Sequence, residues 1–419
     1  LYTNMDIMLS LKILSFLEFF IWGSYLTSLG TYMFVSLKFS GPEIGSIFTT
    51  LGISSLFMPA LIGIIADKYV NSEKLLAVIH SISALFLIWA STVQDSSMMF
   101  WIMLLVAMFY MPTIALVNSI SYNLLNRNNL DVIKDFPAIR VWGTIGFIVA
   151  MWVVDLLGWI VSKNQFYVGA FSGFLMAIFS FFLPACPPAK SVGQKSWVSI
   201  LGLDAFVLMK QPKMLIFFVF SMLLGAALQI TNMLGQDFLG DFGKIDQYKD
   251  AFAVQHTGIL MSISQISETV FILVIPFFLI RYGIKKVMLL SMIAWVLRFG
   301  LFAFGNPGNG LILLILSMVI YGFAFDFFNI SGSLFVEKET DDKIRSSAQG
   351  LFMMMTNGFG SIIGALACGY IVEINTVDGT KDWYSIWMTF AAYALILAVT
   401  FPFVFKYKHD PASMGKIAH

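Results

Sequence analysis

A series of long apolar segments constrains this chain more than any other feature. Twelve of them lie between residues 10 and 405, and each is close to or above the roughly 20 residues that a helix needs to cross a bilayer. Only 12% of the residues are charged, whereas soluble domains carry about 25%. A soluble protein of this composition would have too little polar surface to present to water. The sequence therefore predicts an integral membrane protein.

These segments are predicted to be helices. They lack the alternation of apolar and polar residues that marks the strands of a membrane barrel, and the small residues scattered through them suit packed membrane helices. The first apolar run is too long for a signal peptide and has no cleavage site. The predicted spans are residues 10–37, 43–66, 74–93, 98–124, 138–160, 166–185, 214–235, 252–280, 286–304, 310–336, 346–373 and 382–405.

Lysine and arginine are distributed unequally between the two sets of loops. With both termini on the same side, 18 of these residues fall on that side and 5 on the other, while Arg140 and Arg298 fall within spans. Loops on the cytoplasmic side of a membrane are enriched in positive charge. We therefore expect both termini to be cytoplasmic.

The longest cytoplasmic link divides the spans into six and six. Pro187 and Pro188 end the sixth helix, and residues 197–209 are predicted to form a short helix at the membrane interface. The predicted domains are an N-terminal six-helix bundle (1–185), a cytoplasmic linker (186–213) and a C-terminal six-helix bundle with a short cytoplasmic tail (214–419).

Several function classes are disfavoured by the sequence. A net charge of +1 gives no case for a nucleic-acid partner, and Cys186 and Cys368 have no metal or redox spacing. The phosphate-binding pattern G-x-x-x-x-G-K-S/T does not occur, so ATP is not expected as an energy source. With no metal cluster and no nucleophile–base spacing either, we expect neither an enzyme nor a cofactor.

Polar residues inside the spans form four groups, and such residues are costly in a bilayer and usually functional. A spacing of three or four residues places the members of each group on one helix face. Their amides and carboxylates can bond base edges and hydroxyl groups, and their rings can stack on a planar base. The pattern suits a neutral, ring-bearing solute. The groups are Arg140, Thr144 and Phe147; Gln229 and Asn232; Gln265 and Glu268; and Tyr321, Phe325 and Asp326.

A purely structural role stays open for each of these residues. Amides in membrane helices can simply join helices. Arg140 lies three residues after Pro137 and could extend its charged end to the interface. Glu268 or Asp326 could form a structural ion pair with an arginine.

A loop motif follows the second span. Gly63, Asp67 and Lys68 fit G-x-x-x-D-R/K, the start of the gating-loop motif of major facilitator transporters, although the sequence VNSEK replaces the Gly-Arg that usually follows. Two six-helix halves are also typical of that superfamily. The chain thus resembles a major facilitator transporter.

The resemblance extends to one family, the bacterial nucleoside:proton symporters of the NupG type. It covers the chain from Leu11 to Tyr407. It implies the major facilitator fold, an inner-membrane location, a monomer, and proton-coupled nucleoside uptake by alternating access at a central cavity between the halves. The matching stretches are "LKILSFLEFFIWGSYLTSLGTYMFVSLKF", "DFPAIRVWGTIGF", "LQITNM", "SISQISET", "RYGIKKVM" and "FDFFNISGSLFVEKE".

The resemblance also implies that the ten residues of the four groups surround the nucleoside. We hypothesise that Asp326 and Glu268 form a coupled pair that links proton binding to substrate binding. The chain departs from the family pattern at Glu18, where a glutamine is usual, and at Ala227, where a glutamate is usual. These departures leave open the number of protonatable groups and the base preference. His80 is as compatible with a satisfied interior histidine as with a proton relay.

Two other functions remain possible from the sequence alone. One is a carrier for another neutral polar solute, such as an oligosaccharide, which sugars rather than nucleosides would block. The other is a receptor, which would bind nucleoside without exchanging it across the membrane.

Overall fold

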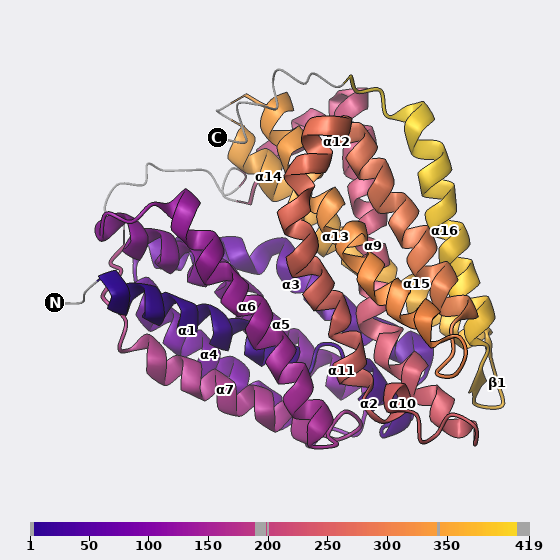
Figure 1. Cartoon of the computed structure of the whole chain (residues 1–419). Coiled ribbons are helices and arrows are strands. Elements are labelled where there is room, and N and C mark those ends of the chain that lie inside the picture. Colours follow the sequence, from indigo (N-terminus) through magenta and orange to yellow (C-terminus); the bar gives the residue numbers. More distant parts are fainter. Residues whose placement is uncertain (1–3, 189–197, 199–200, 342–343, 409–419) are drawn as a thin grey trace. The chain divides into compact units, whose positions relative to one another are not determined.

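The computed structural model describes residues 4–188, 198, 201–341 and 344–408 (Figure 1). The chain divides into two compact units, Leu1–Ser196 (unit 1) and Trp197–His419 (unit 2). Helices dominate both. The one pair of strands in the described part is a short antiparallel hairpin of β1 (Thr376–Val377) and β2 (Thr380–Lys381). Its turn residues, Asp378 and Gly379, have φ values of 49° and 75°, as an Asp-Gly hairpin turn requires.

Unit 1 is a helical bundle. Its central helix α1 packs against α6 and α7, while α5 packs against both α3 and α4. The buried faces meet in an apolar core that includes Leu11, Leu14 and Ile120. The helices are α1 (Asn4–Gly23), α2 (Leu29–Val35), α3 (Gly41–Lys68), α4 (Ser72–Ala90), α5 (Ser96–Arg127), α6 (Val132–Leu156) and α7 (Asn164–Ser180).

Unit 2 is also helical. In it α12 packs against α13 and α16, and α9 packs against η3 and α15. Its elements are η1 (Leu203–Lys210), α9 (Pro212–Asp241), η2 (Phe242–Lys244), α10 (Phe252–Gln255), α11 (Thr257–Met261), α12 (Ile263–Phe304), α13 (Leu311–Glu339), α14 (Arg345–Met353), η3 (Met354–Gly360), α15 (Ser361–Ile374) and α16 (Trp383–Val404).

Nine helical segments in the described part are long and apolar enough to cross a membrane. The longest, Thr257–Phe304, covers the predicted span 286–304 and all of the predicted span 252–280 except its first five residues. It is interrupted at Gly283, whose φ of 80° and ψ of 167° are not helical and favour glycine. The two spans are therefore separate helices joined at this residue. The total of twelve crossings stays a prediction.

Three predicted spans are not continuous α-helices. In the span 252–280, α10 ends at Gln255, α11 ends at Met261 and α12 begins at Ile263. In the span 10–37, α1 ends at Gly23 and α2 begins at Leu29, and the intervening turn is supported by the Ser28 hydroxyl, which donates to Gln165 Oε1 at 3.0 Å. In the span 346–373, η3 (Met354–Gly360) is a π-helix between α14 and α15. Side-chain hydroxyls can satisfy the backbone groups that such breaks release inside a membrane protein.

The predicted interfacial helix 197–209 lies partly outside the described residues, which exclude 197, 199 and 200. In its described remainder, Val198 is helical, Leu201 and Gly202 form a turn in which Gly202 has a φ of 70°, and η1 follows as a 3₁₀-helix. A short helix is therefore present in the described part, as a 3₁₀-helix, and its position at the membrane interface stays a prediction. A 3₁₀-helix is tighter than an α-helix and is common in short connections.

Glycines bring α1 and α6 into close contact. A Cβ atom added to Gly23 would lie 2.5 Å from the carbonyl oxygen of Phe147, and one added to Gly146 would collide with the backbone of Phe16. Small residues let membrane helices approach at the level of their backbones. This approach fixes the position of Phe147, one of the predicted site residues.

Replacing Gly146 with alanine is expected to lower the Tm of the purified protein, because the added methyl group must push α1 away from α6. Overpacking of this kind costs about 1–3 kcal/mol. Gly300→Ala on α12 is the matched control, since nothing lies within 4 Å of the added carbon; its Tm should be equal or higher because alanine favours helix by about 1 kcal/mol. Equal Tm values for both variants would contradict the close approach.

Candidate functional site

Unit 1 contributes the predicted residues of α6. The guanidinium carbon of Arg140 lies 4.0 Å from the ring centroid of Phe19 on α1, a cation–π arrangement. Phe147 is buried and meets the ring of Trp22 edge-on, with centroids 6.3 Å apart. Arg140 and Thr144 are half-buried. One face of α6 therefore carries a charge, a hydroxyl and a ring, as the spacing predicted.

The predicted gating-loop residues lie at the end of α3. Asp67 and Lys68 are exposed, and Gly63 has open space around it. The sequence VNSEK (residues 70–74), which follows this motif, contributes a structural contact through Glu73. The buried carboxylate of Glu73 accepts a hydrogen bond from the backbone N–H of Cys186 at 2.8 Å, which fastens the chain beyond α7 to the start of α4.

Unit 2 holds the aromatic part of the predicted site on α13. The rings of Tyr321 and Phe325 are stacked, with centroids 5.9 Å apart and planes 7° from parallel. Trp295 on α12 meets Tyr321 edge-on at 6.1 Å. A hydrogen bond joins the two helices beside these rings: the Ser267 hydroxyl of α12 donates to the carbonyl oxygen of Val319 on α13. The structure thus brings together residues that the sequence could assign only to separate helices.

Both predicted acids lie near this aromatic pair. Glu268 and Asp326 interact electrostatically with Tyr321, as does Arg298. Asp326 is only 5% exposed, whereas Glu268 is half-buried. A buried tyrosine that interacts with two acids and a guanidinium is a polar centre in an otherwise apolar helix interface.

The amides are placed differently from one another. Gln229 on α9 is buried and Asn232 is half-buried. The Oε1 atom of Gln265 is buried and has no hydrogen-bond partner among the described residues. A buried acceptor without a partner is costly and calls for an explanation. A ligand that donates a hydrogen bond would supply the missing partner.

Arg298 is the functional candidate that the sequence analysis did not assign. It is fully buried, and its guanidinium carbon lies 4.8 Å from the ring centroid of Tyr321. The sequence left open an ion pair between an acid and either Arg140 or Arg298; the hydrogen bonds of Arg298 in the structure go to uncharged groups. They reach the carbonyl oxygen of Ser317 at 2.7 Å, the Thr231 hydroxyl at 3.3 Å and the Ser264 hydroxyl at 3.4 Å.

These partners of Arg298 come from α9, α12 and α13, so one side chain joins the three helices that carry the predicted unit 2 residues. No spacing along the chain could have found them. We infer that Arg298 positions Tyr321.

A small cavity lies beside the same residues. It is lined by Phe325 and Asn329 of α13 and by Thr356 and Asn357 of the π-helix η3. Its volume of about 20 Å³ is room for a water molecule. π-Helical turns often occur at functional sites. The wide turn at η3 here places an amide, Asn357, next to the aromatic pair.

Comparisons with known proteins identify close relatives over nearly the whole chain. A family model described as nucleoside H⁺ symporter matches residues 5–410. Nucleoside permease NupG of Escherichia coli (strain K12) is 54% identical over 412 residues, which are 98% of this chain and 99% of that protein. Xanthosine permease of the same organism is 52% identical over 416 residues, 99% of each chain.

A solved structure is equally similar. The crystal structure of nucleoside transporter NupG superposes with a TM-score of 0.91 at 54% identity, and the match covers 96% of this chain and 100% of that chain.

Replacing Arg298 with lysine is expected to destabilise unit 2. Lysine keeps the charge but cannot reach Thr231, Ser264 and Ser317 together, and each lost hydrogen bond to a charged group costs about 1.5–3 kcal/mol. Thermal unfolding of the purified protein should show a lower Tm. Arg281→Lys serves as the control, because Arg281 is exposed and lies 5.7 Å from its nearest ring centroid; a Tm lowered equally by both changes would argue against the joining role of Arg298.

Proposed function

The chain belongs to the nucleoside H⁺ symporter family, and from that premise we propose that Asp326 and Glu268 together bind the proton that drives nucleoside uptake. The protein is a multi-pass membrane transporter and not an enzyme. One observation carries the proposal. The two acids, on α13 and α12, interact with the same buried tyrosine, whose ring stacks on Phe325.

The predicted fold class is confirmed. The chain is a helical integral membrane protein with the major facilitator fold, as its likeness to a solved nucleoside transporter over nearly the whole chain shows. The alternative of an oligosaccharide carrier is not favoured, because the matching family and the relatives are named for nucleosides. We propose that units 1 and 2 correspond to the two six-helix bundles.

Coupling to protons solves an energetic problem for a neutral substrate. The membrane potential exerts no net force on an uncharged nucleoside, but one co-transported proton supplies about 2.3 kcal/mol per 100 mV. That free energy corresponds to an accumulation of about 50-fold. The protein must therefore contain a group that binds a proton on one side of the membrane and releases it on the other.

Neighbouring carboxyl groups in an apolar interior suit that task. The charged form of a carboxyl group costs more there than in water, and a second carboxylate nearby adds to the cost. Titration belongs to such a pair as a whole. Protonation of the pair removes one negative charge from the surroundings of Tyr321. We propose that this change favours the closed state of the alternating-access cycle.

The remaining predicted residues are proposed to bind the nucleoside itself. The rings of Phe147, Tyr321 and Phe325 would contact the base, because aromatic faces stack on planar rings. Hydrogen bonds to base edges and ribose hydroxyls would come from Arg140, Thr144, Gln229, Asn232 and Gln265. The buried Oε1 of Gln265, which has no hydrogen-bond partner among the residues that the structure describes, supports this assignment.

Further expectations follow from the family and from the distribution of charge. We propose a monomer in the bacterial inner membrane with both termini in the cytoplasm. Gly63, Asp67 and Lys68 would then form the gating loop at the cytoplasmic end of α3.

The change Asp326→Asn should abolish uphill uptake, since an amide cannot release a proton. The measurement is uptake of radiolabelled uridine and adenosine into proteoliposomes, with and without an inward proton gradient. The parent protein should concentrate nucleoside, and the variant should only equilibrate it. Glu268→Gln should weaken accumulation in the same direction.

The control for charge loss is Asp246→Asn, because the Asp246 side chain is fully exposed; it should accumulate nucleoside like the parent. Exchange of labelled for unlabelled nucleoside at equal concentrations separates coupling from binding. Gradient-driven accumulation by Asp326→Asn at the parental level would refute the coupling role.

A further inference from the structure

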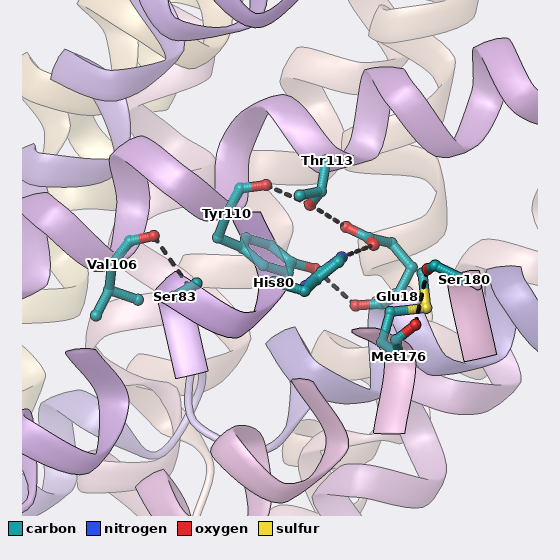
Figure 2. Close-up of polar contacts among 8 residues, drawn as sticks. All are labelled: Glu18, His80, Ser83, Val106, Tyr110, Thr113, Met176 and Ser180. Atoms are coloured by element: carbon teal, nitrogen blue, oxygen red, sulfur yellow. Dashed lines mark hydrogen bonds and ion pairs between the residues drawn. The ribbon is translucent and has the colours of Figure 1, made fainter. Parts of the chain in front are cut away.

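Unit 1 contains a second buried acid that the proposed coupling pair does not involve. Glu18, on α1, is 0% exposed and His80, on α4, is 1% exposed. Figure 2 shows how their neighbours surround them: the His80 Nε2 atom lies 2.9 Å from Glu18 Oε2, and the Thr113 hydroxyl lies 2.5 Å from Glu18 Oε1. The Tyr110 hydroxyl donates to the backbone carbonyl of Glu18 at 2.7 Å.

The hydroxyl of Thr113 has two oxygen neighbours but only one hydrogen. Its Oγ1 atom lies 2.5 Å from Glu18 Oε1 and 2.5 Å from the carbonyl oxygen of Tyr110. A threonine hydroxyl can donate one hydrogen bond and can accept others. If it donates to Glu18, the acid is an ionised acceptor. If it donates to Tyr110, a protonated Glu18 can donate to it in turn.

The same heavy-atom positions therefore fit two hydrogen-bond patterns that differ by one proton on Glu18. In both patterns each carboxyl oxygen of Glu18 has a partner. Buried polar groups are costly when a partner is lost, so a site that keeps its partners in both states can gain and lose a proton without a rearrangement of side chains.

The geometry of His80 places the exchangeable proton on the carboxyl group. The Nδ1 atom of His80 is buried and has no hydrogen-bond partner among the residues that the structure describes. An imidazolium would leave an N–H donor buried there without an acceptor, whereas a neutral ring leaves only a lone pair. We therefore assign the neutral tautomer that carries its hydrogen on Nε2 and donates it to Glu18.

Other titratable groups face this site from the surrounding helices. Tyr110 on α5 and Tyr25 interact electrostatically with Glu18, and Arg140 on α6 interacts with Tyr110. On α7, which also packs against α1, Tyr167 interacts with Tyr32 instead. Arg140 is the permanent charge in this set, and it favours the ionised form of a nearby acid.

We propose that Glu18 is a proton-binding site of unit 1, built by His80 and Thr113 and distinct from Asp326 and Glu268. Its occupancy adds one ionisation to the pH dependence of transport. The binding of the proton follows from the contacts within unit 1 alone, whereas its effect on transport rests on the proposed symport.

Infrared difference spectroscopy between acid and alkaline pH tests the proposal on the purified full-length protein in lipid, without nucleoside. A protonated carboxyl group has its own C=O band. Other carboxyl groups, Asp326 and Glu268 among them, also contribute to the pH-dependent C=O region. We expect that region to contain a band equivalent to one carboxyl group that is present in the parent and missing from Glu18→Gln. Glu337→Gln is the control, because the Glu337 side chain is about half exposed; it should keep the band. An unchanged band in Glu18→Gln overturns the proposal.

The substitutions Thr113→Val and Thr113→Ser provide a second test that leaves the acid in place. Valine removes the hydroxyl that accepts from protonated Glu18, so the Glu18 band should shift in frequency. Serine retains the hydroxyl and should leave the band where it is. A band at the same frequency in all three proteins would contradict the assigned hydrogen bond.

Transport then separates this site from the coupling pair. In Glu18→Gln, uptake should lose one ionisation from its pH profile and should still respond to a proton gradient. If the infrared band is lost but the parent itself shows no gradient-driven uptake, the symport proposal fails and the proton site stands.

Discussion

A bilayer offers the backbone no hydrogen-bond partners, and this constraint shapes both units. Helices satisfy it almost everywhere, so the places where they break are informative. In the break after α1, the Ser24 hydroxyl donates to the carbonyl oxygen of Ile21 at 2.6 Å, and the break in α12 falls on Gly283. In the π-helix η3, the Thr356 hydroxyl donates to the carbonyl oxygen of Phe352 at 3.0 Å. Glycines and hydroxyl groups thus allow irregular backbone within the apolar segments, and the hydroxyl groups supply hydrogen bonds to carbonyl oxygens at these breaks.

Buried ionisable side chains must also find hydrogen-bond partners inside the protein, and they find them on other secondary-structure elements. Arg298 distributes its donors over α9, α12 and α13, and Glu18 gathers donors from α4 and α5. The buried carboxylate of Asp237 accepts from Lys381 at 2.7 Å. Each of these groups bonds to residues far away in the sequence. Each therefore helps to hold the elements of its bundle together. A transporter needs rigid units that move as wholes, and such contacts supply the rigidity.

The sequence predicted what depends on local spacing and missed what depends on contacts across helices. Apolar length located the spans, and intervals of three or four residues placed Tyr321 with Phe325 on one face of α13. The interruption at η3 was not predictable, because glycine, serine and threonine occur throughout the apolar segments. An ion pair between Arg298 and an acid was one possibility that the sequence left open, whereas its hydrogen-bond partners in the structure are hydroxyl and carbonyl groups distant in sequence. The neighbours Glu18 and His80 are 62 residues apart, and no periodicity relates them.

The acidic centres of the two units differ in their hydrogen bonding, and this difference suits different ligands. Around Glu18, each carboxyl oxygen has a partner whether or not the acid is protonated, so the carboxyl group can bind a proton without a further ligand. Around Tyr321, the buried Oε1 of Gln265 has no partner among the described residues, and the half-buried ring of Phe325 faces a cavity. A ligand that donates a hydrogen bond to Gln265 and packs on the ring of Phe325 would complete that centre. Proton binding at Glu18 should therefore be independent of nucleoside, whereas the state of Asp326 and Glu268 should depend on it.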